Sequence, residues 1–207
     1  MQKKKREKPL LIALGGLSGV GKTTLAFKLA EEFDNAIVID ADLERKKMHG
    51  VSPFTSLSPE AYSHEENRKF LDHLRPIQIA ALAQHDAVII TGTFITRETR
   101  ARTEEIAANN NADFVGLWMT VPVREIFSRL SARQKGTSFS DAGAEVLRKQ
   151  LDIVTSLTEE DLSWNETRAS GTPNDVLCRA RMVIEHVLSR NNLPLSSLKP
   201  PRFPPCS

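Results

Sequence analysis

A glycine-rich turn between a buried strand and an amphipathic helix constrains this sequence more than any other feature. The run LLIAL at residues 10–14 is short, apolar and followed by glycine, which is typical of a strand buried in a parallel sheet. The stretch over residues 23–33 repeats large apolar side chains at four-residue spacing, which predicts a helix with one apolar face. The turn GGLSGVGKTTLA at residues 15–26 therefore leaves the carboxyl end of a strand and opens a helix.

The rest of the chain continues this alternation of apolar runs and helical patterns. Such an order predicts right-handed crossovers and an α/β fold, with a parallel sheet covered by helices on both faces. Pro76 is expected to kink or break the helix that contains it. Further strands are expected at residues 36–40, 87–91, 114–121 and 162–167, and further helices from Ser58-Pro59, at 97–109, at 122–133, from about 141 and from 173.

The length of 207 residues fits a single domain with tails. We expect a basic, flexible lead-in at residues 1–9 and the folded domain at residues 10–190. Residues 191–207 are rich in proline, which sustains neither a helix nor a central strand, so this end is expected to be a loose tail or a strap across the surface.

Charge, apolar runs and cysteines exclude several classes of protein. The net charge of +2 gives no strong case for binding nucleic acid. No apolar run approaches the ~20 residues of a membrane span, and the start of the chain has no clear signal peptide. Cys178 and Cys206 form neither a metal-binding spacing nor a disulfide framework. We therefore expect a cytoplasmic protein that does not bind membranes.

The turn itself fits the phosphate-loop pattern G-x-x-x-x-G-K-[ST] in full, from Gly16 to Thr23. Its glycines allow successive backbone N–H groups to point at phosphate oxygens, and the following helix adds its positive end. Lys22 is expected to reach the β- and γ-phosphates, and the Thr23 hydroxyl to hold Mg²⁺. The sequence thus predicts a nucleoside triphosphate site formed by Gly16, Ser18, Gly19, Val20, Gly21, Lys22, Thr23 and Thr24.

Two carboxylates follow the second expected strand, in VIDADLER. Asp40 and Asp42 would point to the same side if the strand continued, at the sheet edge where ligands bind. We expect Asp40 to face Mg²⁺ and Asp42 to act as the general base that takes a proton from an attacking hydroxyl. Arg45, one helical turn further on, would pair with charge on the acceptor. The alternative for the aspartates is a helix cap, and for Arg45 a solvated helix face.

These residues carry a resemblance to the small P-loop kinases of the adenylate-kinase-like group. The chain most resembles the ATP-binding kinase module fused to aminoglycoside-phosphotransferase-like domains in bacteria. It is also similar to gluconate and shikimate kinases, chloramphenicol phosphotransferase, zeta toxins and polynucleotide kinase domains. The motifs that carry the resemblance are GGLSGVGKTTLA, the D-x-D-x-x-R of residues 40–45, VIITGTF, RLSARQKGTSFSDAG and ASGTP.

The resemblance implies a three-layer P-loop fold with sheet order 2-3-1-4-5, a small lid, and transfer of phosphate from ATP with Mg²⁺. It implies that Asp42 activates the acceptor hydroxyl. It further implies that Gly171 and Thr172 lie where the adenine is held through backbone. We also expect an acceptor-side flap over about residues 46–75.

One departure from the family pattern concerns the end of the third expected strand. Family members often have D-A-T-F where this chain has Thr91-Gly92-Thr93-Phe94, so a carboxylate is missing. Either Asp40 takes over its role, or turnover is slow, or the chain binds nucleotide without transferring phosphate. Thr93 is expected either to contact the acceptor or to pack at the strand end.

Two arginines four residues apart, Arg129 and Arg133, share one helix face before a polar segment with a glycine. Arginines that close over a transferred phosphoryl group stabilise its charge, so we expect a lid over about residues 129–141. The alternative is a solvated helix end whose cations suit the helix dipole.

The function expected from these residues is an ATP-dependent, Mg²⁺-requiring kinase acting on a hydroxyl of a small molecule. A kinase of polynucleotide 5′-hydroxyls is possible but not favoured, because the domain shows no obvious basic groove. A zeta-toxin-like kinase of nucleotide-sugars is a third possibility. An alternative of a different class is an ATP-binding regulatory module without productive transfer.

Overall fold

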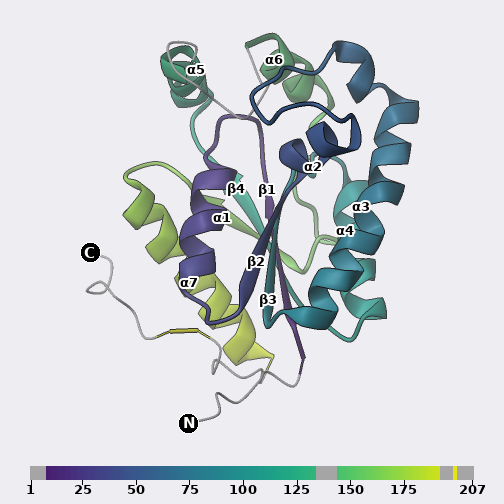
Figure 1. Cartoon of the computed structure of the whole chain (residues 1–207). Helices are drawn as coiled ribbons and strands as arrows, with labels where there is room; N and C mark the ends of the chain where they lie inside the picture. Colours follow the sequence, from purple (N-terminus) through teal and green to yellow (C-terminus); the bar gives the residue numbers. More distant parts are fainter. Residues whose placement is uncertain (1–7, 134–143, 192–197, 200–207) are drawn as a thin grey trace.

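The computed structural model describes residues 8–133, 144–191 and 198–199, and the structural statements below refer to these residues. Five strands form one parallel sheet in the order β2-β3-β1-β4-β5, with helices on both faces (Figure 1). This arrangement confirms the expected α/β class and the sheet order that the resemblance implied.

The helices and strands alternate along the chain as the sequence indicated. The strands are β1 (Leu10–Gly15), β2 (Ala36–Asp40), β3 (Ala87–Thr91), β4 (Asp113–Thr120) and β5 (Trp164–Arg168). The helices are α1 (Lys22–Glu31), α2 (Ala41–Met48), the 3₁₀ helix η1 (Pro59–Tyr62), α3 (His64–Gln84), α4 (Arg97–Asn109), α5 (Val123–Arg133), α6 (Ala144–Ile153) and α7 (Pro173–Arg190).

The central strand β1 buries different residues on its two faces. Leu10, Ile12 and Leu14 pack in the core cluster that includes residues of α1 and α7. Leu11 lies on the opposite face and packs with residues of α3 and α4. Every residue of β1 is buried, which explains why its sequence is continuously apolar rather than alternating.

Figure 1 shows α2, α5 and α6 near the end of the sheet where β1 leads into the glycine-rich turn. The register places Thr91 opposite both Leu14 of β1 and Asp40 of β2. The ends of three neighbouring strands therefore meet at one edge, which is where ligands bind in open parallel sheets.

Helix α3 starts later than the sequence indicated. It continues through Pro76 without the break that was one of the two expected outcomes, and it begins after Ser63, whose hydroxyl accepts a hydrogen bond from the backbone of the first turn. The earlier signal at Ser58-Pro59 opens η1 instead. Leu74 and Gln78 are buried on either side of the proline, so tertiary packing holds the helix together there.

The ends of the chain are only partly described. Residues 1–7 of the basic lead-in lie outside the described residues, as do 192–197 and 200–207 of the expected tail. Leu198 forms a β-bridge with Phe33, and the backbone N–H of Lys199 donates to the Glu32 carbonyl at 2.7 Å, so these two residues lie against the end of α1.

The expectation that the cysteines form no disulfide was wrong for Cys178, which is disulfide-bonded. Cys206 lies outside the described residues. No described helix is both long and apolar enough to cross a membrane.

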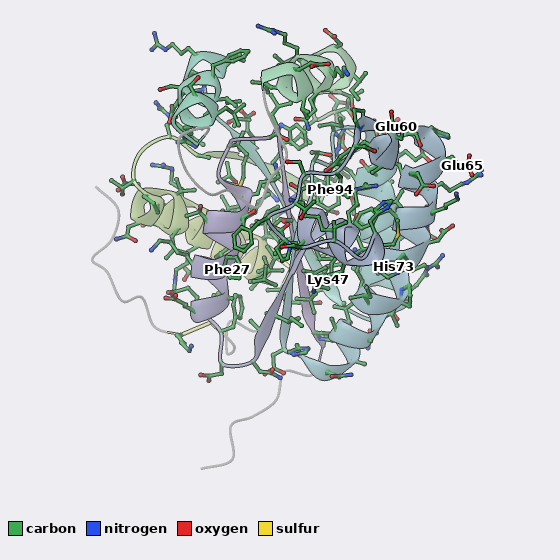
Figure 2. All side chains as sticks on the ribbon, turned by 45° about the horizontal axis from the view of Figure 1, so that its top comes forward. Phe27, Lys47, Glu60, Glu65, His73 and Phe94 are labelled. Carbon is green, nitrogen blue, oxygen red and sulfur yellow. The ribbon has the colours of Figure 1, made fainter. Side chains whose placement is uncertain are left out.

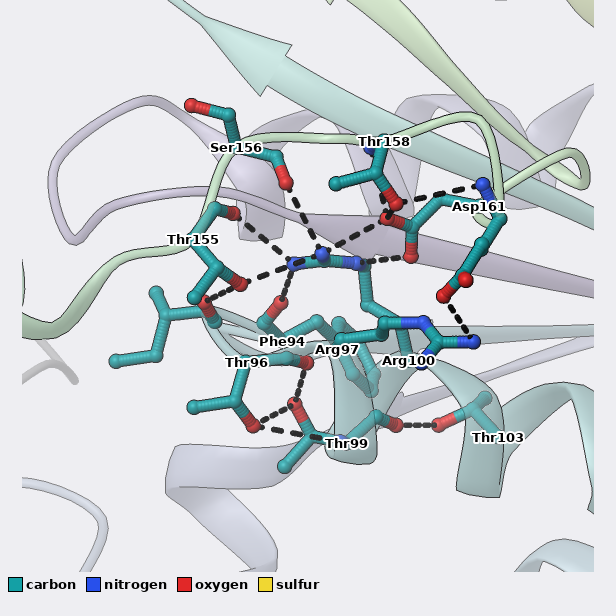
Figure 3. A network of polar contacts seen from close by, with 12 residues as sticks. Phe94, Thr96, Arg97, Thr99, Arg100, Thr103, Thr155, Ser156, Thr158 and Asp161 are labelled. Carbon is teal, nitrogen blue, oxygen red and sulfur yellow. Dashed lines mark hydrogen bonds and ion pairs between the residues drawn. The ribbon is translucent and has the colours of Figure 1, made fainter.

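A buried ion pair joins α4 to the segment between α6 and β5 (Figure 3). Arg100 is fully buried and donates from Nε and Nη2 to the two carboxylate oxygens of Asp161, at 2.6 and 3.0 Å. Its remaining donors reach the carbonyls of Phe94, Thr155 and Ser156 at 3.1 to 3.3 Å. One guanidinium thus connects the loop after β3 to the chain that follows α6.

Asp161 should make the stability of the protein depend on pH in the acid range. Hydrogen bonds from Arg100 lower the pKa of Asp161 from 3.8 to about 2. Because the folded-state pKa is depressed, its stabilisation is present above pH ~4 and is lost as pH falls toward ~2. Asp161→Asn should lower the free energy of unfolding by about 3–5 kcal/mol at pH 7.

Urea titrations at pH 7, 4 and 2.5 would measure this effect. The Asp161→Asn variant should lose less stability than the wild type between pH 4 and 2.5. Equal losses in the two proteins would contradict the assignment of this pH dependence to Asp161.

Candidate functional site

The glycine-rich turn forms a tight loop at the carboxyl end of β1. Gly16, Gly19 and Gly21 have φ angles of 128°, 90° and 105°, a region that side chains with a Cβ rarely adopt. A Cβ at Gly19 would lie 2.9 Å from Ile126 of α5, so the loop and α5 pack without space for a larger residue. The loop therefore has the backbone geometry that a phosphate-binding turn requires.

Lys22 begins α1 and folds back over the loop. Its ammonium group donates to the carbonyls of Gly16 and Leu17, at 2.9 and 3.0 Å. The positive end of α1 lies at the same place, because the helix starts at Lys22. Both features put positive charge where the phosphates of a nucleotide would bind.

Asp40 connects three elements at the centre of the site. One of its carboxylate oxygens, Oδ2, accepts hydrogen bonds from the hydroxyls of Thr23 at 2.7 Å and Thr91 at 3.0 Å. The other, Oδ1, accepts from the backbone N–H groups of Asp42 and Leu43 and so caps α2. Asp40, rather than Asp42, is therefore the helix cap, and the same side chain also bonds to Thr23 as expected.

Asp42 lies in the first turn of α2, not on a continued strand. The strand ends at Asp40 and the helix starts at Ala41, so the premise that the two aspartates alternate along one strand was wrong. The helix start nevertheless keeps Asp42 beside the capped end of α2, only two residues from the carboxylate that contacts Thr23. Its role as general base remains a proposal.

Arg45 is buried rather than solvated, with 8% of its surface exposed. Its guanidinium donates to the Ala61 carbonyl at 2.9 Å and to Asn67 Oδ1 at 2.7 Å, and it lies 4.0 Å from the centre of the Phe70 ring. Burial lowers the pKa of Arg45, against the attraction of nearby Tyr62 and Asp42. In this structure Arg45 joins α2 to η1 and α3; contact with an acceptor remains a proposal.

The expected acceptor flap, residues 46–75, forms one flank of the site. In Figure 2, Glu60, Glu65 and His73 lie along the flank formed by η1 and α3, whereas Phe27 lies on the opposite flank. A hollow of about 450 Å³ opens in the flap. It is lined by His49, Val51, Ser56, Leu57, Ser58, Glu60, Ala61 and Glu66.

The loop after β3 lies directly against the phosphate loop. The carbonyl of Thr93 accepts a hydrogen bond from the Gly16 N–H at 3.0 Å, and the Gly92 N–H donates to the Leu14 carbonyl at 3.2 Å. Phe94 has a φ of 46°, which is unfavourable for an aromatic residue. The backbone of Thr93 is thus brought to the site, while contact between its side chain and an acceptor remains a proposal.

Arg129 joins the phosphate loop to the loop after β5. Its guanidinium donates to the Val20 carbonyl at 2.8 Å, to the Ala169 carbonyl at 2.9 Å and to Glu125 at 2.5 Å. Glu125 also accepts from the Ser170 hydroxyl at 2.8 Å, and this hydrogen bond is the main reason that its pKa is lowered. The structure therefore places Arg129 beside the nucleotide loop, and a catalytic role for it remains a proposal.

The other residues expected at the nucleotide site are only partly described. Arg133 ends α5, but its side chain and residues 134–143 of the expected lid lie outside the described residues. Thr172 caps α7 through a capping box with Asp175, which fits the order Thr-Pro-Asn-Asp at the start of the helix. Both its N–H and its hydroxyl bond to Asp175 Oδ2, at 2.8 and 2.7 Å, whereas the neighbouring Gly171 is exposed.

Three contributors to the site were missed at the sequence level. The i, i+4 spacing of Glu125 and Arg129 is a signal that could have predicted their pairing. Thr91 was noted only as the replacement of an expected aspartate, yet its hydroxyl bonds to Asp40. Gln150 of α6 bonds to Ser18 of the phosphate loop, and no local pattern around Gln150 indicates this contact.

The residues at the centre of the site fit a magnesium ion. Mg²⁺ prefers oxygen ligands and is commonly held by one or two carboxylates together with the phosphates of the substrate. Thr23 supplies a hydroxyl and Asp40 a carboxylate, with their oxygens 2.7 Å apart. No group of three or more histidine, cysteine or acidic side chains among the described residues forms a metal cage, so the remaining ligands would be phosphate oxygens and water.

A family model described as an AAA domain matches residues 11–157. No curated protein matches the chain by sequence. Similar solved structures include a gluconokinase from Sinorhizobium meliloti 1021, with 16% sequence identity and a TM-score of 0.62 over 89% of this chain and 99% of that one. A sugar kinase from Janibacter sp. HTCC2649 has 22% identity and a TM-score of 0.63, over 86% of this chain and 95% of that one.

The shikimate kinase from Aquifex aeolicus has 15% identity and a TM-score of 0.57, over 86% of this chain and 98% of that one. At these identities the likeness establishes the fold. It confirms the expected resemblance to small P-loop kinases.

Replacing Asp40 should separate its role toward magnesium from its role in the fold. Asp40→Asn keeps an oxygen that can cap α2 but removes the negative charge beside Thr23. We expect the Mg²⁺ concentration needed for half-maximal ATP binding to rise about ten- to a hundredfold. Fluorescence titration of ATP binding against Mg²⁺ would measure this change.

Thr91→Val is the matched control, because it removes a hydroxyl that bonds to the same oxygen but leaves the carboxylate in place. Its Mg²⁺ requirement should stay near that of the wild type. An unchanged requirement in Asp40→Asn would show that Asp40 does not face the metal.

Proposed function

The chain belongs to this AAA domain family, and on that premise we propose that it is an ATP-dependent kinase that phosphorylates a hydroxyl of a small molecule. The observation that carries the proposal is the contact of Asp40 with Thr23, which sets a carboxylate beside the phosphate loop. The other oxygen of Asp40 caps α2, and Asp42 lies in the first turn of that helix. A loop that binds phosphate and a second carboxylate close by are the parts that phosphoryl transfer to a hydroxyl needs.

In the proposed reaction the acceptor oxygen attacks the γ-phosphorus of ATP, and the bond from that phosphorus to the β,γ-bridging oxygen breaks. Asp42 takes the proton of the acceptor hydroxyl, and ADP leaves. Lys22 and Arg129, with Arg133, balance the negative charge of the transferred group. Bound between Thr23, Asp40 and the phosphates, Mg²⁺ would neutralise charge that develops on the phosphate oxygens.

The acceptor side is proposed to be the flap at residues 46–75. More of the surface of its hollow is apolar than polar, but His49, Ser56, Ser58 and Glu66 supply groups that exchange hydrogen bonds with hydroxyls. Asp42 lies in the first turn of α2, and His49, which lines the hollow, follows the last residue of that helix. An acceptor that occupied the hollow and reached Asp42 would therefore lie along α2. The hydrogen-bonding groups of the lining support a small acceptor that carries hydroxyls; the gluconokinase and sugar kinase fold neighbours are named for such molecules.

One observation favours the alternative of nucleotide binding without transfer. Thr91 occupies the position where the resembled kinases often have an aspartate, so the site contains one carboxylate fewer. Its hydroxyl is bonded to Asp40 and supplies no negative charge to a metal. A transfer assay distinguishes this alternative from a kinase.

Transfer of labelled γ-phosphate from ATP with Mg²⁺ would test the proposal directly. The purified chain would be incubated with separate pools of sugars and polyols, other small alcohols, nucleosides, nucleotide-sugars and a 5′-hydroxyl oligonucleotide. Label in the sugar and polyol pool is the expected result. Label only in the oligonucleotide or nucleotide-sugar pool would refute the small-molecule acceptor, and tight ATP binding without any label would favour the binding module.

Asp42→Asn should lower the rate of transfer by about 10²- to 10⁴-fold, because the acceptor proton loses its base, while ATP affinity stays near that of the wild type. Glu44→Gln is the matched control on α2, where Glu44 pairs with Lys47 at 2.6 Å, and should retain activity. Lys22→Ala should lose both ATP binding and transfer. Loss of ATP binding in Asp42→Asn would contradict the assignment of Asp42 as the base.

A further inference from the structure

The tip of the phosphate loop is bonded to a side chain from a distant helix. The N–H of Ser18 donates to Gln150 Oε1 at 2.9 Å, and Gln150 Nε2 donates to the Ser18 hydroxyl at 2.9 Å. The two residues lie 132 positions apart in the sequence. One carboxamide thus binds both the backbone and the side chain of a single loop residue.

Helix α6 is oriented so that Gln150 faces the loop. Leu147 is fully buried, and Leu151 packs against the same core cluster. Residues three and four apart share one face of a helix, so Gln150 lies on the face that these leucines anchor. Ser18 is also buried, with 8% of its surface exposed. The contact is therefore built into the packing and does not depend on a mobile surface side chain.

The position of Lys22 indicates which part of the loop Ser18 occupies. The lysine of this motif reaches the β- and γ-phosphates, and in this structure its ammonium group bonds to the carbonyls of Gly16 and Leu17. Ser18 is the next residue along the chain. Gln150 is therefore held at the end of the loop where the outer phosphates of the nucleotide bind.

We propose that Gln150 is a specificity-determining residue that recognises the terminal phosphate of ATP and so distinguishes ATP from ADP. A carboxamide has two N–H groups, and one of them is donated to the Ser18 hydroxyl. Among residues 8–133, 144–191 and 198–199, no group accepts a hydrogen bond from the second N–H, which can therefore donate to an oxygen of the γ-phosphate, while the bond to the Ser18 N–H fixes the amide plane. The inference rests on the proposed function in one respect, which is that ATP occupies the loop.

Calorimetric titration with Mg²⁺-ADP and with a Mg²⁺-bound β,γ-imido analogue of ATP would test this role. In Gln150→Leu, affinity for the ATP analogue should fall at least about tenfold more than affinity for ADP, because a hydrogen bond to a charged phosphate is lost. Gln150→Glu should lower the ratio further, because a carboxylate would face the phosphate. Thermal unfolding would establish that each variant is folded.

Lys149→Ala is the matched control on α6. Lys149 pairs with Glu145 at 3.0 Å on the exposed side of the helix, and its side chain is 70% exposed. This variant should keep the wild-type ratio of ATP-analogue to ADP affinity. If Gln150 only supported the fold of the loop, its replacement would weaken both nucleotides equally, so an unchanged ratio in both Gln150 variants would overturn the inference.

The outcomes for this inference and for the kinase proposal can be told apart. A changed ratio in a protein that transfers phosphate to no acceptor would uphold the role of Gln150 and refute the kinase. Phosphate transfer together with an unchanged ratio of ATP-analogue to ADP affinity in the Gln150 variants would uphold the kinase and refute the role of Gln150. Absence of binding of either nucleotide to the wild type would overturn both.

Discussion

The carboxylate of Asp40 is the interaction on which the arrangement of the site depends. Its two oxygens hold the hydroxyls of Thr23 and Thr91 and the first turn of α2, so one side chain sets the ends of β2 and β3 against the start of α1. A buried carboxylate is stable only when its oxygens are hydrogen-bonded, and these four donors supply that requirement. The position of Asp42 follows, because it lies one residue beyond the start of the helix that Asp40 caps.

A second set of contacts joins the nucleotide side of the domain to the acceptor side through α6. In the last turn of the helix, Gln150 bonds to Ser18 of the phosphate loop. Just beyond the same end, the Thr155 N–H donates to the Ile95 carbonyl at 2.9 Å, and Arg100 joins Thr155 to Phe94. The unfavourable backbone conformation of Phe94 is thus maintained by a buried ion pair, and strain of this kind persists only where the surroundings fix it.

The sequence predicted the features that depend on local patterns and missed those that depend on tertiary placement. Short apolar runs identified β1 to β4, and the glycine spacing located the phosphate loop, because both signals lie within a few residues. The fifth strand was also expected in place, although β5 (WNETR) has no apolar run. The contact between Ser18 and Gln150 joins residues that only the completed fold brings together. Arg45 was expected at an acceptor or in solvent, whereas the packing of η1 and α3, which no local pattern specifies, buries it.

The threonine at position 91, where the resembled kinases often have an aspartate, lowers the negative charge of the site. An aspartate there would place a second carboxylate within hydrogen-bonding distance of Asp40, and two such charges repel unless a cation or a proton lies between them. A hydroxyl donates to Asp40 without adding charge, so the carboxylate is satisfied before any metal binds. The same substitution removes one anionic attraction for Mg²⁺, and more of the metal affinity must then come from the phosphates of the nucleotide. A site of this composition would take up its metal together with ATP rather than ahead of it.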